Sequence, residues 1–176
     1  RGVFGIEMCI FDNSGRALPW DGEASGALKV RGPWVAKGYY GLTDVPGDEG
    51  CPVDENGWFD TGDVASISPD GFLKITDRTK DVIKSGGEWI SSIEIENAAV
   101  NHEDISEAAV IGRSHPKWTE RPLLICVLQE GKSLSSEEVL EFLKDKLHKM
   151  AIPDAVEFID ELPHTATGKI NKLGLR

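Results

Sequence analysis

The pattern of turn-forming residues changes near residue 77, and this change constrains the fold more than any other feature of the chain. Before it, Gly, Pro, Asn and Asp interrupt short stretches rich in β-branched and aromatic residues. After it, segments with helical periodicity alternate with apolar strands. The sequence therefore predicts an α+β protein, in which a small β-rich unit is followed by a small α+β unit.

Short strands dominate the predicted first unit. The residue pattern predicts strands over 3–11, 27–31, 58–63, 64–68 and 72–76. A Pro-Asp-Gly sequence, which favours a tight turn, separates the last two of them. Several short strands at this spacing are typical of a small barrel or a twisted sheet.

The predicted second unit mixes helices with strands that we expect to pair antiparallel. Apolar periodicity places helices over 92–102 and 135–147, and strands over 105–112, 123–129 and 156–159. No internal repeat is visible in either unit.

Both predicted helices have a serine where a helix N-terminus is expected. Ser92 is placed to cap the first helix. Ser135 and Glu138 have the Ser-x-x-Glu spacing of a capping box at the start of the second. Val139 and Leu143 then begin an apolar stripe, so the second helix is the more strongly predicted of the two.

Charge and composition exclude several classes of protein. A chain of 176 residues with 40% hydrophobic residues can bury a core, and its net charge is −11. Residues 1–76 carry 6 basic and 12 acidic side chains, and residues 77–176 carry 13 and 18. Because both halves are acidic, nucleic acid and anionic membrane surfaces are disfavoured as partners. No apolar run approaches the roughly 18 residues of a membrane helix.

Cysteine and histidine give no metal-binding pattern. Cys9, Cys51 and Cys126 are odd in number and lack CxxC spacing, and the four histidines are scattered. Free thiols favour a reducing, cytoplasmic compartment. The chain begins with Arg1 in a strand-like stretch rather than with an initiator Met, so we expect further sequence upstream.

Lys169 directly follows a glycine in an octapeptide that spans residues 163–170, Pro-His-Thr-Ala-Thr-Gly-Lys-Ile. A Pro/Thr/Gly-rich loop that leads into a lysine indicates a positive charge on a movable arm. The compact, flexible ammonium suits phosphate or carboxylate oxygens. Taken alone, the octapeptide also fits an ordinary surface lysine.

Two further motifs precede this octapeptide, Gly-Trp-Phe-Asp-Thr-Gly-Asp over 57–63 and a charged, glycine-containing segment over 77–88. Together the three motifs resemble the C-terminal third of adenylate-forming enzymes, which include acyl-CoA synthetases, peptide-synthetase adenylation domains and beetle luciferase. The resemblance covers essentially all 176 residues. It implies a distorted-barrel subdomain of the large AMP-binding domain over 1–77, a hinge linker over 78–81, and a mobile C-terminal domain over 82–176.

The resemblance implies nucleotide-binding and catalytic roles for three side chains. Asp63 matches the family aspartate that accepts hydrogen bonds from both ribose hydroxyls of ATP, a task that suits an ionised carboxylate. Arg78 matches the arginine that contacts the ribose and phosphates. Lys169 matches the lysine that reaches the substrate carboxylate and the α-phosphate. An aspartate that merely closes a turn is the alternative for Asp63.

The same resemblance implies a hinge and a thiol-binding loop. Lys80 matches the family hinge residue, with an ordinary exposed lysine as the alternative. Lys84, Ser85, Gly86 and Gly87 match the loop that lines the pantetheine tunnel of CoA, where glycines allow close backbone approach.

Three neighbouring positions limit what the resemblance implies. Trp89 is read either as a core anchor or as a wall of the tunnel. Asp77 replaces the usual glycine, and Glu88 stands where some relatives have a basic residue, so the arginine contact of those relatives is not carried over.

The expected function is that of an acyl-CoA synthetase acting on a fatty or other carboxylic acid, with ATP, CoA and Mg²⁺. Segments 18–22, 31–35 and 85–91 resemble medium- and long-chain ligases more than peptide-synthetase domains. We expect the magnesium ligands and the phosphate loop in a missing N-terminal domain, so this chain alone should not turn over ATP. Two alternatives remain: an adenylation domain that loads a carrier protein, and a non-catalytic interaction module of the same fold. The sequence is also compatible with a homo-oligomer.

Overall fold

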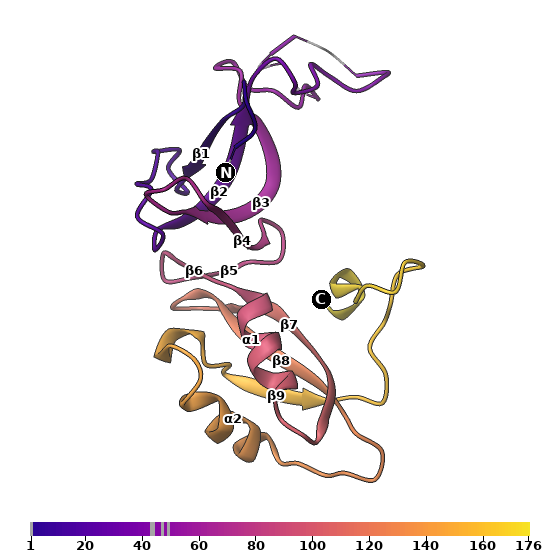
Figure 1. Cartoon of the computed structure of the whole chain (residues 1–176). Coiled ribbons are helices and arrows are strands. Elements are labelled where there is room, and N and C mark those ends of the chain that lie inside the picture. Colours follow the sequence, from indigo (N-terminus) through magenta and orange to yellow (C-terminus); the bar gives the residue numbers. More distant parts are fainter. Residues whose placement is uncertain (1, 43–44, 47, 49) are drawn as a thin grey trace. The chain divides into compact units, whose positions relative to one another are not determined.

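Two compact units make up the chain, Arg1–Lys80 and Asp81–Arg176. The computed structural model describes residues 2–42, 45, 46, 48 and 50–176, and Figure 1 shows its elements in chain order. None of the helices in these described residues is long and apolar enough to cross a membrane.

The first unit is a four-stranded antiparallel sheet with the strands in sequence order. Its strands are β1 (Glu7–Phe11), β2 (Ser25–Arg31), β3 (Phe59–Ile67) and β4 (Leu73–Arg78). Within the described part of the chain no ladder joins β4 to β1, so the predicted distorted barrel takes the form of an open sheet with two edges. A small apolar core that includes Ile10, Leu28, Ala65 and Ile67 covers one face of it.

The prediction of two separate strands over 58–63 and 64–68 is wrong, because β3 is one continuous strand. Ala27 pairs with Val64 and Lys29 with Asp60, so three residues of β3 lie opposite the single residue Leu28 of β2. A bulge of this kind bends a strand without ending it. The Thr-Gly-Asp sequence inside β3 therefore marks a bulge, where the sequence pattern predicted a strand boundary.

A second irregularity lies between β3 and β4. Val64 pairs with Asp77 and Ala65 with Ile75, which leaves Thr76 as an extra residue of β4. The Thr76 hydroxyl donates to the Val64 carbonyl oxygen at 3.2 Å, so the side chain of the extra residue bonds back across the ladder.

The second unit has five strands, two α-helices and two short 3-10 helices. In chain order these are β5 (Ile83–Ser85), β6 (Glu88–Ile90), α1 (Ser92–Val100), β7 (Ile105–His115), β8 (Thr119–Leu128), α2 (Ser136–Lys144), η1 (Lys149–Ala151), β9 (Ala155–Phe158) and η2 (Lys172–Leu175). The sheet order is β6-β5-β8-β7, with β9 also paired to β8.

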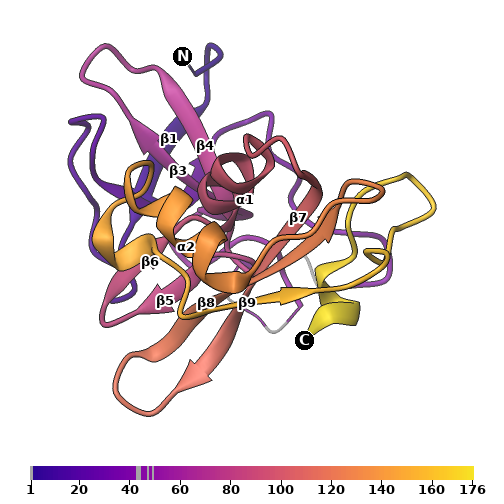
Figure 2. The same cartoon turned by 90° about the horizontal axis from the view of Figure 1, so that it is seen from below.

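Helices cover one face of this sheet and the C-terminal tail covers the other (Figure 2). Side chains of α1 and α2 pack with Val110, Leu124 and Cys126 in the larger core. The neighbouring strand residues, among them Ile111 and Leu123, point to the opposite face and pack in a second core with residues from the tail. Burial on both faces explains why β7 and β8 read as continuous apolar runs. It also raises the pKa of the Cys126 thiol to about 12.

The predicted strands and helices of this unit are found, with corrected pairing and ends. Strands β5 and β6 have only three residues each and were not predicted. Strand β9 pairs parallel to β8, so the antiparallel expectation is wrong for it. The reason is the connection through α2, since a crossover that contains a helix joins parallel strands.

The capping prediction is confirmed for α2 and wrong for α1. Ser135 and Glu138 form the predicted capping box. In α1 the cap is Ser91, whose hydroxyl accepts from the Glu94 amide at 3.2 Å, and Ser92 is the first helical residue and fully buried. Two adjacent serines made the choice ambiguous, because either one can cap a helix.

Truncation of Leu143 tests the packing of α2 against the sheet. Leu143 is fully buried in the larger core, so we expect Leu143→Ala to lower the free energy of unfolding by about 2–5 kcal/mol. Urea unfolding followed by circular dichroism measures this loss. Lys144→Ala on the exposed face of α2 is the control, and an equal loss in both variants would contradict the assignment.

Candidate functional site

Asp63 and Arg78 form a cross-strand ion pair at the edge of the first unit. The two residues are register partners on β3 and β4, and the Arg78 Nε atom lies 3.1 Å from the Asp63 Oδ1 atom. The Asp63 side chain is 23% exposed and that of Arg78 59% exposed. The pair thus presents carboxylate acceptors and guanidinium donors side by side and within reach of a ligand, which suits ribose hydroxyls and phosphate oxygens.

The β3 bulge supports Asp63 through Thr61. The Thr61 hydroxyl donates to the Leu28 carbonyl oxygen of β2 at 2.9 Å and accepts from the Asp63 amide at 3.2 Å. The Gly62 carbonyl oxygen accepts from the Thr79 amide at 2.9 Å. Three backbone groups at the bulge are therefore bonded, and these bonds hold the segment that carries Asp63.

Asp77 and Lys80 flank Arg78. Asp77 is only 2% exposed, and its Oδ1 atom accepts from the Arg78 amide at 2.7 Å. Asp77, which replaces the glycine usual in the family, thus provides a carboxylate that accepts from the Arg78 amide. Lys80 is exposed in the turn that follows β4 and is the last residue of the first unit. Its role as a hinge stays a prediction.

The predicted thiol-binding loop is a tight hairpin between β5 and β6. Ser85 pairs with Glu88, so Gly86 and Gly87 form a two-residue turn, and both have positive φ, +60° and +92°. Such a turn favours glycine at both positions. The Gly86 amide donates to the Trp118 carbonyl oxygen at 2.9 Å, and a Cβ atom on Gly86 would lie 2.8 Å from the Trp118 ring.

Lys84 and Trp89 lie on the exposed part of this hairpin. The Lys84 Nζ atom lies 5.5 Å from the centre of the Trp89 ring, and the Lys84 amide donates to the Glu120 Oε2 atom at 2.9 Å. Trp89 is only partly buried and belongs to none of the three apolar cores. The core-anchor reading of Trp89 is therefore wrong.

Arg121 is bonded to the hairpin through Ser85, and no sequence motif predicts this role. Its guanidinium donates to the Ser85 hydroxyl at 3.3 Å and to the Met150 and Ile152 carbonyl oxygens at 2.7 and 2.9 Å. Its Nε atom lies 2.8 Å from Asp154 Oδ1. The planar fork of an arginine can hold several acceptors at once, so this side chain joins the hairpin to the segment before β9.

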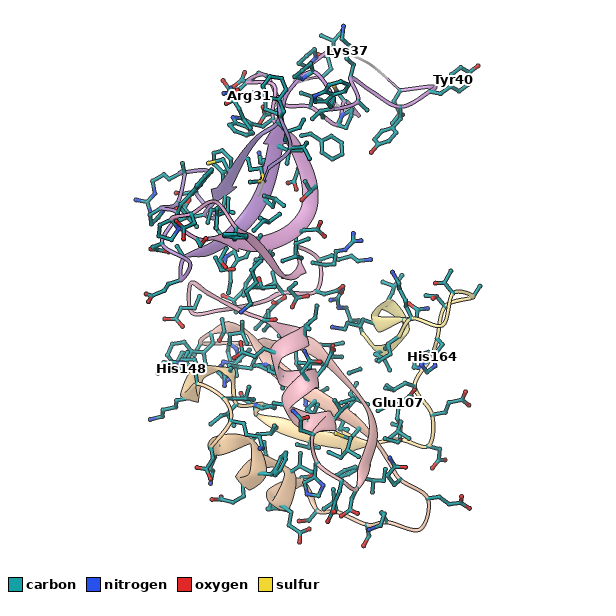
Figure 3. The ribbon with its side chains drawn as sticks, in the orientation of Figure 1. Arg31, Lys37, Tyr40, Glu107, His148 and His164 are labelled. Atoms are coloured by element: carbon teal, nitrogen blue, oxygen red, sulfur yellow. The ribbon has the colours of Figure 1, made fainter. Side chains whose placement is uncertain are left out.

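Lys169 is exposed at the foot of a small loop. The Thr165 amide donates to the Lys169 carbonyl oxygen at 2.7 Å, and the Lys169 amide donates to the Thr165 hydroxyl at 3.2 Å. His164 pairs with Ile170 in an isolated bridge, and its Nε2 atom lies 3.4 Å from Glu107 Oε1 (Figure 3). The predicted movable arm is thus a folded loop with its own hydrogen bonds.

The structure brings some of the predicted site residues together within each unit. Asp63 and Arg78 are in contact in the first unit. The β5–β6 hairpin and the loop over 163–170 both belong to the second unit, where they lie on opposite sides in both views (Figures 1 and 2). Each unit therefore carries its own part of the predicted chemistry.

The donor groups fit a nucleotide better than a metal ion. The exposed Asp63–Arg78 pair matches the hydrogen-bonding groups of a ribose phosphate. Among the described residues, no three His, Cys, Asp or Glu side chains are grouped so that they could hold a metal ion. The described residues therefore offer no cage of protein ligands for a metal ion.

Comparison with known proteins identifies the family. Residues 94–169 match the family model of the AMP-binding enzyme C-terminal domain. The resemblance to adenylate-forming enzymes that the three motifs indicated is therefore confirmed.

Its curated relatives include CoA ligases of bacteria. The 3-methylmercaptopropionyl-CoA ligase of Ruegeria lacuscaerulensis is 52% identical over 100% of this chain and 32% of that protein. The medium-chain-fatty-acid–CoA ligase of Ectopseudomonas oleovorans is 48% identical over 100% of this chain and 31% of that protein. The chain spans about a third of the length of these relatives.

Solved structures agree with the sequence matches. ATP-bound MatB from Rhodopseudomonas palustris has a TM-score of 0.81 at 31% identity, over 98% of this chain and 33% of that chain. The o-succinylbenzoate CoA synthetase of Bacillus subtilis, in complex with its acyl-adenylate intermediate, has a TM-score of 0.79 at 32% identity, over 99% of this chain and 34% of that chain. The predicted fold class is confirmed.

Alanine substitution of the two hairpin glycines separates the cost of a positive φ from the cost of a clash with the Trp118 ring. Both Gly86→Ala and Gly87→Ala place a side chain at positive φ, but only the first meets a neighbour, because nothing lies within 4 Å of a Cβ atom on Gly87. We expect Gly86→Ala to lower the free energy of unfolding of the second unit about 1–3 kcal/mol further than Gly87→Ala does. Urea unfolding measures the difference.

If the clash with the Trp118 ring destabilises Gly86→Ala, removal of that ring should restore part of the lost stability. Trp118→Ala removes the ring that a Cβ atom on Gly86 meets, so the cost of Gly86→Ala should be smaller in that background than in the parent. Equal costs of Gly86→Ala in the two backgrounds would show that positive φ alone causes the loss.

Proposed function

We propose that the chain works as the C-terminal part of an acid–thiol ligase, which activates a carboxylic acid with ATP and transfers the acyl group to CoA. The Asp63–Arg78 pair, next to the sequence likeness to CoA ligases, is the observation that carries the proposal. Fatty acids are the proposed substrate class, because a medium-chain and a long-chain fatty-acid ligase are among the relatives at 48% and 43% identity.

In the first proposed half-reaction, a substrate carboxylate oxygen attacks the α-phosphorus of ATP. A new P–O bond forms, pyrophosphate leaves, and an acyl adenylate results. The Asp63 carboxylate accepts from the ribose hydroxyls, and Arg78 donates to ribose and phosphate oxygens. The Lys169 ammonium offsets the repulsion between the two anions and stabilises the charge that develops on the phosphoryl oxygens.

In the second proposed half-reaction, the CoA sulfur attacks the acyl carbonyl carbon. The thioester bond forms, the bond from carbon to the phosphate oxygen breaks, AMP leaves, and the thiol proton is released. The exposed turn at Gly86 and Gly87 lets the slender pantetheine approach the backbone, with Lys84 and Ser85 on the strand before it. Rotation about Lys80 would exchange the Lys169 loop for this hairpin between the two steps.

The proposal gives the N-terminal domain of the same enzyme the remaining parts of the site. We place the acyl pocket, the phosphate loop and the Mg²⁺ ligands there, consistent with the third of its relatives' length that this chain spans. Mg²⁺ would neutralise the phosphate charge of ATP. The three cysteines are free thiols, which supports a cytoplasmic enzyme.

Removal of the Lys169 ammonium tests the first half-reaction. In the complete enzyme we expect Lys169→Ala to lower the rate of acid-dependent ATP–pyrophosphate exchange by roughly 10²–10³-fold, because a preorganised charge of this kind contributes about 2.7–4 kcal/mol to the barrier. Thioester formation from synthetic acyl-AMP and CoA should be retained. Lys144→Ala, which removes an exposed lysine from α2, is the matched control. An unchanged exchange rate in Lys169→Ala would favour a non-catalytic module.

Replacement of the Asp63 carboxylate tests nucleotide binding. Asp63→Asn keeps the size of the side chain but removes its charge and one acceptor oxygen. A hydrogen bond to a charged group contributes about 1.5–3 kcal/mol, so we expect the KM for ATP to rise roughly 10- to 150-fold. Asp70→Asn, in the turn between β3 and β4, is the control. A KM for ATP that matches the parent would exclude Asp63 from the nucleotide site.

A further inference from the structure

The tail that follows the Lys169 loop is fixed to the body of the second unit by a second lysine. The Lys172 Nζ atom lies 2.7 Å from Glu96 Oε1 and donates to the Ser92 hydroxyl at 2.6 Å. The two charged side chains are only 12% and 15% exposed, and Ser92 is fully buried. This ion pair is therefore shielded from solvent, in contrast to the exposed Lys169 three positions before it.

Glu96 connects this pair to the central sheet. Its Oε1 atom also accepts from the backbone amide of Val110 in β7 at 2.7 Å. Ser92 and Glu96 both belong to the first two turns of α1, and η2, which begins at Lys172, packs against β7. Lys172 is thus attached at once to a helix and, through Glu96, to a strand.

Ile170 packs against the second apolar core, but most hydrogen bonds of the loop fix its shape more than its position. Thr165 and Lys169 bond to each other, and the Asn171 amide donates to the Pro163 carbonyl oxygen at 2.7 Å. These bonds join the two sides of the loop and move with it. The His164–Glu107 pair does reach β7, but the Glu107 side chain is 41% exposed, so water screens it.

We propose that Lys172 is a positioning residue: its pair with Glu96 holds the Lys169 loop in the direction that adenylation needs. The inference rests on the proposed function, because it concerns how Lys169 reaches the reacting phosphate. A displacement of about 1 Å in a positioned group can lower a rate by roughly 10²-fold. Because Lys172 is three residues from Lys169, loss of its ion pair is expected to slow the first half-reaction.

A second ion pair extends the anchoring to the start of the unit. The Arg176 NH2 atom lies 3.0 Å from Asp81 Oδ1, and Asp81 directly follows the predicted hinge residue Lys80. The tail after Lys169 is therefore tied to α1 by Lys172 and to the first residue of the second unit by Arg176. Movement of the unit would carry the Lys169 loop with it as one body.

The test must separate positioning from stability, because removing one partner of a shielded ion pair leaves the other charge unpaired. We would compare Lys172→Met, Glu96→Gln, the double variant and Lys172→Arg in the complete enzyme. Glu96→Gln keeps an oxygen that accepts from the Val110 amide, and the double variant removes both charges of the Lys172–Glu96 pair together. The measurements are both half-reactions and the urea midpoint of the second unit.

In the double variant we expect the urea midpoint to return close to that of the parent. Its ATP–pyrophosphate exchange rate should stay about tenfold to a hundredfold below the parent, with the KM for ATP unchanged. Thioester formation from synthetic acyl-AMP should equal that of the parent. Lys172→Arg, which keeps the charge, should recover part of the exchange rate lost in Lys172→Met.

Recovery of the exchange rate together with the urea midpoint in the double variant would overturn the inference, since Lys172 would then act through stability alone. An equal loss in both half-reactions would overturn it as well. If Lys169→Ala stops exchange while the double variant retains it, only the role of Lys172 fails. If Lys169→Ala leaves exchange intact, the proposed function fails and the role of Lys172 fails with it.

Discussion

The antiparallel pairing of β7 with β8 is the interaction on which the rest of the second unit depends. The ladder runs from the pair Ile105–Leu128 to the pair His115–Thr119. Strand β5 pairs with β8 at Thr119, and β9 pairs with β8 from Leu123 onward. Helices cover one face of the ladder, and residues of the segment after β9, among them Leu162 and Ile170, cover the other. The hairpin and the loop proposed for the two half-reactions are thus held by one pair of strands, from different sides.

Local signals predicted the elements of this unit well, because each signal and its consequence lie within a few residues. The Ser135–Glu138 capping box begins α2 as the sequence indicated, and the apolar runs of β7 and β8 follow from burial on two faces. The errors arise where a non-local partner decides. Thr61 is bonded to Leu28 in another strand, which keeps β3 continuous where the sequence suggested a boundary. The parallel pairing of β9 likewise depends on where α2 returns the chain.

The same distinction applies to the candidate site. Residues that carry a motif, such as Asp63, Arg78 and Lys169, could be proposed from sequence because their neighbours in the chain are distinctive. Arg121 and Lys172 could not, because their partners are backbone carbonyls and side chains far along the chain. A lone arginine or lysine in a sequence has no local signal that separates a shielded anchor from a solvated surface charge. The roles of Arg121 and Lys172 could not be predicted because their partners are distant in the sequence.

The extra residue in β4 decides which charges meet across the strands. Because Thr76 is an extra residue of β4 between the pairs Ala65–Ile75 and Val64–Asp77, Asp63 lies opposite Arg78. If the pairing of Ala65 with Ile75 continued without the bulge, Asp63 would lie opposite Asp77, and two carboxylates would face each other. The bulge in β4 is therefore as important to the site as the side chains themselves. A shift of register that paired Thr76 with Val64 would therefore replace an ion pair with a repulsive pair, although the sequence would be unchanged.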